Sequence, residues 1–330
     1  MLQWFEKRVD PYPTKDLNKP LPTTFFAFVW QATKGIRPFL FLLIACTAAA
    51  ACFEALFFSY IGKLVDWLTK SQPNTFLESN QQNITILISI LFANIFFVSL
   101  QSVIKHQVLF SNFPMRLRWR FHNLLLQQSL DFFHTDFAGR LSAKVMQTAL
   151  AVREFWMILG DMLVYVLIYF ITISLVLGSI SPVLIIPLIL WLALFIAIAS
   201  YFIPRLGKVS QEQADARAVM TGRVTDAYTN IQTVKLFAHA GRESQYAKSS
   251  MQQFMVTVFK QMRLGARYSI SISLLNIVLY AGVIGTAVYL WMQGQAELGV
   301  IAAATAMILK LSSIARSEER RVGKECLRLC

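Results

Sequence analysis

The stretch PFLFLLIACTAAAACFEALFFSY, residues 38–60, decides the fold class of this chain. Its 23 residues include one charged side chain, Glu54. A helix of this length rises about 1.5 Å per residue and so crosses a hydrocarbon layer of roughly 30 Å. Five further apolar stretches follow, the last of them short, at residues 84–104, 162–180, 183–203, 269–292 and 300–315. The sequence therefore predicts an all-α, polytopic membrane protein with six transmembrane helices.

The composition of the 330 residues agrees with this assignment and excludes an ordinary soluble enzyme. Hydrophobic residues make up 56% of the chain and charged residues 15%, whereas a soluble domain carries about 25% charged residues. The first apolar stretch begins after a polar segment of 37 residues, and no small-residue cleavage site follows it. We therefore do not interpret it as a signal peptide.

The 31 Lys and Arg residues are distributed unevenly between the predicted spans. Six precede the first span, and the successive connections carry two, seven, none, ten and none. Positive residues accumulate on the cytoplasmic side of membrane proteins. We therefore expect a cytoplasmic N-terminus and cytoplasmic second and fourth connections. The net charge of +13 is interpreted as this topology signal, and no nucleic-acid partner is expected.

The two cytoplasmic connections, residues 105–153 and 204–268, are too long for plain loops. Both have apolar residues at helical spacing, so each is predicted to be a helical hairpin that extends its spans beyond the membrane. Pro114 is expected to kink the first hairpin. The hairpins reverse at residues 129–141 and 233–243, which we name the first tip and the second tip. Apolar side chains at such tips are typical of a docking site for another protein domain.

The tip sequences resemble those of a known family. The first tip reads Phe-Phe-x5-Gly-Arg-Leu at residues 132–141, and the second reads Thr-Val-Lys-x-Phe at residues 233–237, with Arg242 and Glu243 nearby. Placed after the second and fourth spans, they resemble the transmembrane domain of bacterial ATP-binding cassette (ABC) exporters. The resemblance covers about residues 20–315.

The resemblance implies roles for individual residues. It makes residues 131–141 and 234–243 the two coupling helices and residues 25–34 an amphipathic elbow helix before the first span. The residues that it places at the coupling surfaces are Asp131, Phe132, Phe133, His134, Gly139, Val234, Lys235, Phe237, Arg242 and Glu243.

The implied organisation has three parts. Residues 1–37 form a cytoplasmic segment with the elbow helix, residues 38–315 form the six-helix transmembrane domain, and residues 316–330 are interpreted as a non-native or frameshifted tail. We expect the family's nucleotide-binding domain to be missing from these 330 residues, because neither Gly-x4-Gly-Lys-Ser/Thr nor Leu-Ser-Gly-Gly-Gln occurs in them. ATP and Mg²⁺ are therefore expected on that missing domain, with no catalytic, cofactor-binding or metal-binding residue in this chain.

The expected function is the membrane half of an ATP-driven exporter, part of an ATP-hydrolysing translocase in the bacterial inner membrane. Its expected partners are a nucleotide-binding domain, fused or separate, a second copy of itself in a homodimer, and membrane lipids. The expected substrate is hydrophobic or amphipathic. The alternative is a non-transporting membrane scaffold that binds a cytoplasmic partner through the same tips.

Two other groupings of polar residues have competing interpretations. Asp131, His134 and Asp136 share the first tip, but three ligand types on one turn are weak evidence for a metal, so docking is the preferred interpretation. Glu54 and Lys310 lie inside predicted spans, where charges usually face a cavity or a partner. Either they pair across the cavity, or Glu54 reaches the outer interface while Lys310 lies near the inner one.

Overall fold

The computed structural model describes residues 2–14, 22–70, 72, 76–135, 138–236 and 240–328, and these ranges contain helices and no strand. Five helical segments are long and apolar enough to cross a membrane, at Arg37–Lys70, Gln81–Leu126, Lys144–Ile180, Pro182–Thr229 and Gly241–Met292. A shorter apolar helix follows at Leu298–Ile314. The predicted all-α, multi-pass architecture with a short last span is confirmed.

The chain forms two compact units. Unit 1 comprises Met1–Val176 and Glu297–Ala303, and unit 2 comprises Leu177–Ala296 and Ala304–Cys330. The last helix, α13 (Leu298–Arg328), therefore begins in unit 1 and continues in unit 2. It passes through the start of the predicted tail without a break, and the non-native origin of that tail stays a prediction.

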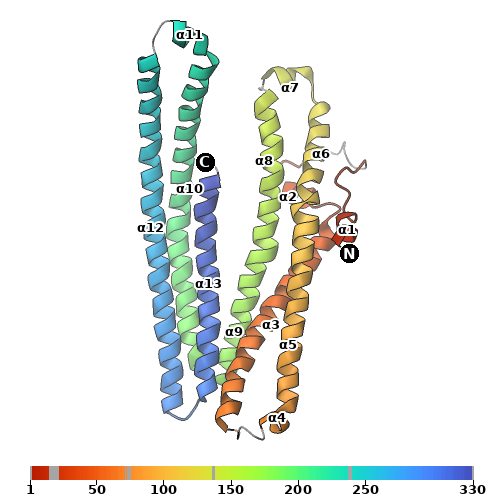
Figure 1. Cartoon of the computed structure of the whole chain (residues 1–330), viewed down its shortest axis with the longest axis vertical. Helices are drawn as coiled ribbons and strands as arrows, with labels where there is room; N and C mark the ends of the chain where they lie inside the picture. The colour runs from red at the N-terminus through yellow and green to blue at the C-terminus, as the bar shows by residue number, and fades with distance from the viewer. Residues whose placement is uncertain are drawn as a thin grey trace. The chain divides into compact units, whose positions relative to one another are not determined.

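Unit 1 contains the first two spans, the third span up to Val176, and the first tip (Figure 1). Two of these spans are interrupted by π-helical turns, named η1 and η2. The elements in chain order are α1 (Leu2–Glu6), α2 (Phe25–Ala32), α3 (Arg37–Lys70), α4 (Phe76–Ser79), α5 (Gln81–Val103), η1 (Ile104–Phe110), α6 (Asn112–Leu126), α7 (Leu130–Thr135), α8 (Ala138–Met157), η2 (Ile158–Leu163) and α9 (Val164–Ile180). The short helix α2 lies within the residues expected to form the elbow helix.

The break in the second span precedes Pro114. This proline lies in the first turn of α6, and it has no N–H to donate to the carbonyl of Phe110, the last residue of η1. The π-helical turn η1, whose backbone bonds run i→i+5, lies on the N-terminal side of this proline. The kink expected at Pro114 stays a prediction.

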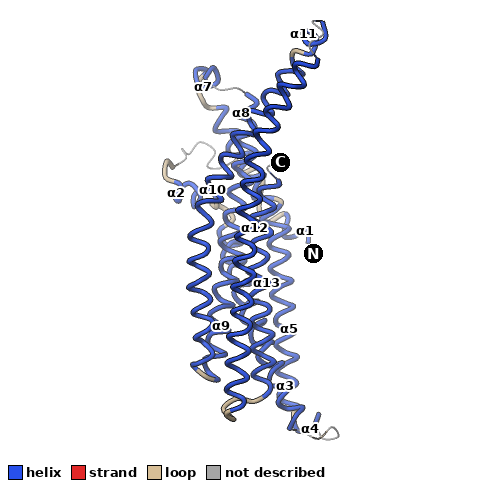
Figure 2. Tube along the Cα trace, turned by 90° about the vertical axis from the view of Figure 1, so that its left-hand side faces the viewer, coloured by secondary structure: helices blue, strands red, loops and turns tan. Residues whose placement is uncertain are grey.

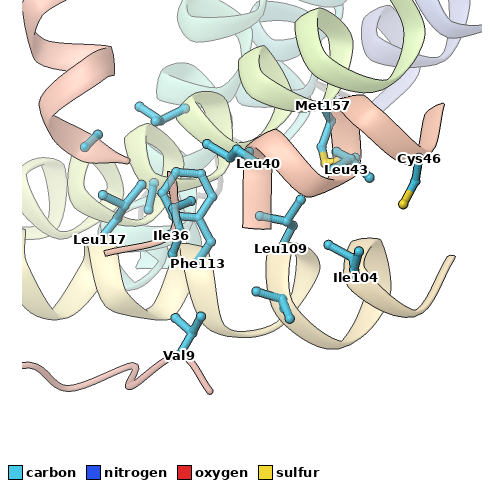
Figure 3. Packing of buried hydrophobic residues seen from close by; sticks show 14 of the residues in the cluster. Val9, Ile36, Leu40, Leu43, Cys46, Ile104, Leu109, Phe113, Leu117 and Met157 are labelled. Atoms are coloured by element: carbon cyan, nitrogen blue, oxygen red, sulfur yellow. The ribbon is translucent and has the colours of Figure 1, made fainter. Parts of the chain in front are cut away.

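The core of unit 1 joins α3 to η1, α6 and α8 (Figure 3). Its buried side chains include Ile36, Leu40, Leu43, Cys46, Ile104, Leu109, Phe113, Leu117 and Met157. Val9 adds the N-terminal segment to this core. Farther along that segment, Arg116 donates to the carbonyl of Asp10 at 2.8 Å, and the ring of Tyr12 meets Trp119 edge to face with 5.6 Å between centroids. The N-terminal segment is thus held along α6.

Helix α3 closely approaches the start of α13 within unit 1. A Cβ atom added to Gly62 would lie 2.4 Å from the carbonyl oxygen of Gly299, so neither position has room for a larger residue. Asp66 Oδ1 accepts a hydrogen bond from the N–H of Gly299 at 2.6 Å, which satisfies one of the free donors at the N-terminus of α13. Lys70 and Glu297 form an exposed ion pair in the same unit.

Unit 2 is dominated by two long helices joined at the second tip (Figures 1 and 2). Its elements after the end of α9 are η3 (Pro182–Leu184), α10 (Ile185–Thr229), α11 (Ile231–Leu236), α12 (Ala240–Met292) and most of α13. With 45 and 53 residues, α10 and α12 are about 68 Å and 80 Å long. Trp191 of α10 donates to Asn276 of α12 at 3.2 Å in a buried contact, and Tyr280 of α12 hydrogen-bonds Ser312 of α13.

Candidate functional site

The first tip is the short helix α7, which joins α6 to α8. The N–H of Phe132 lies 3.4 Å from the Ser129 hydroxyl oxygen and 3.1 Å from its carbonyl oxygen, so Ser129 acts as the N-cap. Asp131 lies in the first turn, where the helix dipole favours a negative charge, and its side chain is exposed. The local sequence thus fixes where the tip begins.

Phe132 and Phe133 of the first tip also line grooves in unit 1. Phe132 and Phe133 meet edge to face, with 5.6 Å between ring centroids. Phe132 is half-buried and lines a groove of about 340 Å³ together with Phe28 of α2 and Phe121 of α6. Phe133 is 40% exposed and lines a second groove between α6 and α8. Each ring therefore lines a groove of its own unit and is also partly accessible at the surface.

The second tip consists of α11 and the start of α12. Lys235 is exposed in the last turn of α11, where the helix dipole favours a positive charge, and Val234 is half-buried. In the first turn of α12, Arg242 is exposed and Glu243 is half-buried. The predicted polar residues of this tip therefore lie at helix ends and are at least partly accessible.

Several predicted tip residues fall outside what the structure describes. Phe237 and Asp136 are outside the described ranges, as is the side chain of His134, while Gly139 is placed only by its position in the first turn of α8. Within the described residues, no group of three or more His, Cys, Asp or Glu side chains is arranged to hold a metal.

Among the described residues of the tip helices, the most exposed large apolar side chains are leucines that the tip motifs do not specify. Leu130 at the start of α7 is 80% exposed, and Leu236 at the end of α11 is 83% exposed. Tyr228, near the end of α10, is 71% exposed. Six-residue helices are too short for a hydrophobic period to show which face is exposed. The sequence signal that could have identified these residues is a leucine inside each predicted reversal.

A buried polar network lies where the second and third spans are interrupted. Lys105 of η1 and Asp161 of η2 form an ion pair, with side chains that are 22% and 11% exposed. Gln101 Nε2 donates to Asp161 Oδ1 at 2.6 Å and to Thr47 Oγ1 of α3 at 2.9 Å. The network therefore connects three helical segments. π-helical turns are frequent at functional sites, which makes this network a second candidate site.

Sequence reasoning missed this network because its charges lie at the edges of the apolar stretches. Asp161 immediately precedes residues 162–180 and Lys105 immediately follows residues 84–104, so counting charges assigns both to the cytoplasmic connection. The structure places them within the continuous helical segments Gln81–Leu126 and Lys144–Ile180. The sequence signal that could have revealed this network is that apolar residues flank Asp161 on both sides.

The intramembrane carboxylate Glu54 accepts a hydrogen bond from the Tyr165 hydroxyl within unit 1. Tyr165 stacks on Tyr169 with 5.9 Å between centroids and 5° between ring planes. Lys310 is half-buried in α13, in unit 2. Glu54 therefore has a partner on the third span, and its pairing with Lys310 stays a prediction.

Comparison with known proteins gives two matches. Residues 40–314 match the family model of the ABC transporter transmembrane region. The chain is also similar to an uncharacterized ABC transporter ATP-binding protein of Haemophilus influenzae, with 44% identity over 316 residues. That match covers 96% of this chain and 51% of the relative, so the chain spans about half the length of the curated relative.

Proposed function

Because the chain belongs to the ABC transporter transmembrane family and is the membrane half of such a transporter, we propose that it forms the substrate pathway of an exporter. In this proposal it works as a homodimer in a bacterial inner membrane, with a cytoplasmic N-terminus and a hydrophobic or amphipathic substrate. The observation that carries the proposal is the exposure of Leu130 and Leu236 at the two tips. Exposed leucines at the ends of helical hairpins suit insertion into clefts of a nucleotide-binding domain.

In this proposal ATP and Mg²⁺ bind outside this chain, because its sequence has no phosphate-binding loop motif. We assign both to the nucleotide-binding domain, which is the proposed partner. The contribution of this chain is to convert a displacement of its tips into a movement of its spans.

The second hairpin is built to carry such a displacement. Lys260 of α12 pairs with Glu212 of α10 at 3.0 Å, and Arg223 of α10 donates to Ser249 of α12 at 3.2 Å. These contacts connect the two helices along the part that extends toward α11. Coupling also requires that the contact between tip and nucleotide-binding domain has a different free energy in the two transport states.

The proposal is tested on the intact transporter in nanodiscs, with spin labels on a cysteine at Gln295 in the connection between α12 and α13. In a homodimeric exporter, the distance between the two labels should increase when ATP and vanadate are bound, because the outer ends of the two copies separate. Distance distributions from pulsed electron paramagnetic resonance measure this change. A distance that does not respond to nucleotide, with nucleotide binding intact, would support the scaffold alternative instead.

The orientation is tested separately with single cysteines in intact cells. A cysteine at Gln295 should react with a membrane-impermeant maleimide from outside, and one at Ser210 should react only after permeabilisation. Reversed labelling would overturn the proposed orientation and, with it, the cytoplasmic location of the tips.

A further inference from the structure

A groove of about 440 Å³ lies between α6 and α8, next to the first tip. Its walls are largely apolar and include Met115, Leu141 and Val145. Tyr12 of the N-terminal segment and Phe133 of α7 also line it, and Figure 1 shows α6 and α8 running side by side from α7. A concave and mainly apolar site of this volume is typical of those that bind small molecules.

Two hydrogen-bond donors of the lining residues lack an acceptor. Nε of Arg118 and Nε1 of Trp119 are buried and have no hydrogen-bond partner in the part of the chain that the structure describes. Neither group can accept a hydrogen bond, so a complementary ligand must supply acceptor atoms. His122 also lines the groove, whereas the described lining residues include no Asp or Glu. The groove is therefore lined by a cationic residue and lies beside two buried unpaired donors, with no acid among its described lining residues.

We propose that this groove binds an amphipathic anion, namely a single acyl chain with an anionic oxygen headgroup such as a carboxylate or a phosphate. On binding, the side chains of Arg118 and Trp119 turn their buried donors toward the headgroup, whose oxygens accept hydrogen bonds from them. Charge-assisted hydrogen bonds, such as the one from Arg118, are among the strongest in proteins. The acyl chain lies against the apolar walls of α6 and α8. The site lies between α6 and α8 beside the first tip, and the inference does not depend on the proposed exporter function.

Occupancy of the groove acts on the first tip through Phe133. Because this ring lines the groove and is partly exposed, a ligand in the groove covers it and favours the packing of α7 against α6 and α8. A ligand that binds one arrangement of the tip better than another shifts the tip toward that arrangement.

The test uses the 330-residue chain in phosphatidylcholine nanodiscs with a photoactivatable dodecanoate as the probe. We expect saturable labelling of peptides that contain residues 115–126 and 141–146. Excess dodecanoate or dodecyl phosphate should prevent the labelling, and the stronger competitor identifies the headgroup. Dodecanol, which has the same chain without the charge, should not compete. Labelling that does not saturate, or equal competition by dodecanol, would overturn the proposal.

Three variants separate the headgroup site from general partitioning into the nanodisc. Arg118→Met should weaken binding at least about tenfold, and Trp119→Phe, which keeps an aromatic ring, about threefold. Arg120→Met, on the same helix but not among the described lining residues, is the matched control and should bind like the unaltered chain. Unchanged binding in Trp119→Phe and Arg118→Met, or an equal loss in the control, would contradict the assignment. The conservative Trp119→Phe variant decides the question if Arg118→Met does not fold.

Discussion

The hairpins of the two units end in similar tips but are built differently. The hairpin of unit 1 is interrupted at η1 and η2, which hold the buried Lys105–Asp161 pair. In the hairpin of unit 2, α10 continues as α-helix through Pro204, and α12 extends over 53 residues. A proline inside a helix removes one backbone hydrogen bond, so α10 can bend at Pro204, where the second hairpin begins. Beyond Pro204, α10 and the facing part of α12 contain no proline and no π-helical turn. The first hairpin is therefore suited to local rearrangement, and the part of the second hairpin beyond Pro204 is suited to act as a lever.

The largest expected difference between the hairpins comes from breaking one ion pair in each. Asp161→Ala leaves the half-buried Lys105 without its partner and should lower the free energy of unfolding by about 3 kcal/mol. Glu212→Ala breaks the exposed pair with Lys260 and should change it by less than about 0.5 kcal/mol. Unfolding of each variant by sodium dodecyl sulfate in mixed micelles measures both values.

The matched control for this comparison is the double variant Asp161→Ala with Lys105→Met. Because it removes both charges, it should regain most of the lost stability. Equal losses in Asp161→Ala and Glu212→Ala would remove the distinction between a buried network in one hairpin and surface pairing in the other.

The second expected effect is a difference between the two tips of the intact transporter. One variant should affect only the docking of the nucleotide-binding domain, and the other should also affect the stability of the chain. Leu236→Ala truncates an exposed side chain, so it should leave the stability of the chain within about 0.5 kcal/mol and weaken docking of the nucleotide-binding domain by about 2 kcal/mol. Phe133→Ala should lower both quantities, because its ring also lines a groove in its own hairpin. Thermal unfolding and the ratio of substrate transported to ATP hydrolysed measure the two effects.

The opposite pattern would assign these residues to packing. If Phe133→Ala and Leu236→Ala both lower thermal stability while transport per hydrolysed ATP is unchanged, neither side chain serves coupling.

A smaller effect is expected from stiffening the lever. Gly222 lies inside α10, and a Cβ atom added there would meet no other atom within 4 Å. Gly222→Ala should therefore stabilise the chain by about 0.5–1 kcal/mol, because alanine loses less conformational entropy in a helix. ATP hydrolysis coupled to transport should be unaffected. A stabilised variant with slower coupled turnover would show that the second hairpin must bend, contrary to its interpretation as a lever.

The smallest expected effect concerns the exposed ion pair between Lys70 and Glu297, which belongs to neither hairpin. The hydrogen bond from Lys70 lowers the pKa of Glu297. Since the pKa in the folded state is below the unfolded value, the stabilisation is present at neutral pH and is lost as the pH falls from about 5 through the lowered pKa. The melting temperature should show a slight acid dependence that Glu297→Gln reduces. An identical pH profile in this variant would assign the acid dependence to other carboxylates.

Much of the fold could be predicted from sequence because the bilayer restricts it strongly. Spans need a minimum apolar length and reversals must lie outside the hydrocarbon layer, so run lengths predicted the six apolar helices, including the short one at Leu298–Ile314. The π-helical turn that precedes Pro114 was not predicted. The extent of η1 depends on how residues 104–110 pack against α3, and a pattern along one helix does not contain that information.

The candidate sites were less accessible to sequence reasoning. The reversals were located, but whether Leu130 or Phe133 is the more exposed residue depends on the neighbouring helices. The burial of Lys105 and Asp161 is tolerable because each neutralises the other and Gln101 adds a hydrogen bond. These partners lie on different helical segments, so only the tertiary structure brings them together.

The π-helical turns also determine how far each helix is rotated about its own axis. A turn closed by i→i+5 bonds accommodates an extra residue relative to an α-helix, and one residue corresponds to about 100° of rotation. The face of α6 that carries Phe113, Leu117 and Phe121 is therefore oriented by the backbone of η1, which precedes it. Insertion or deletion of a single codon in the span would turn this face, together with its groove and tip, while the span kept its apolar composition.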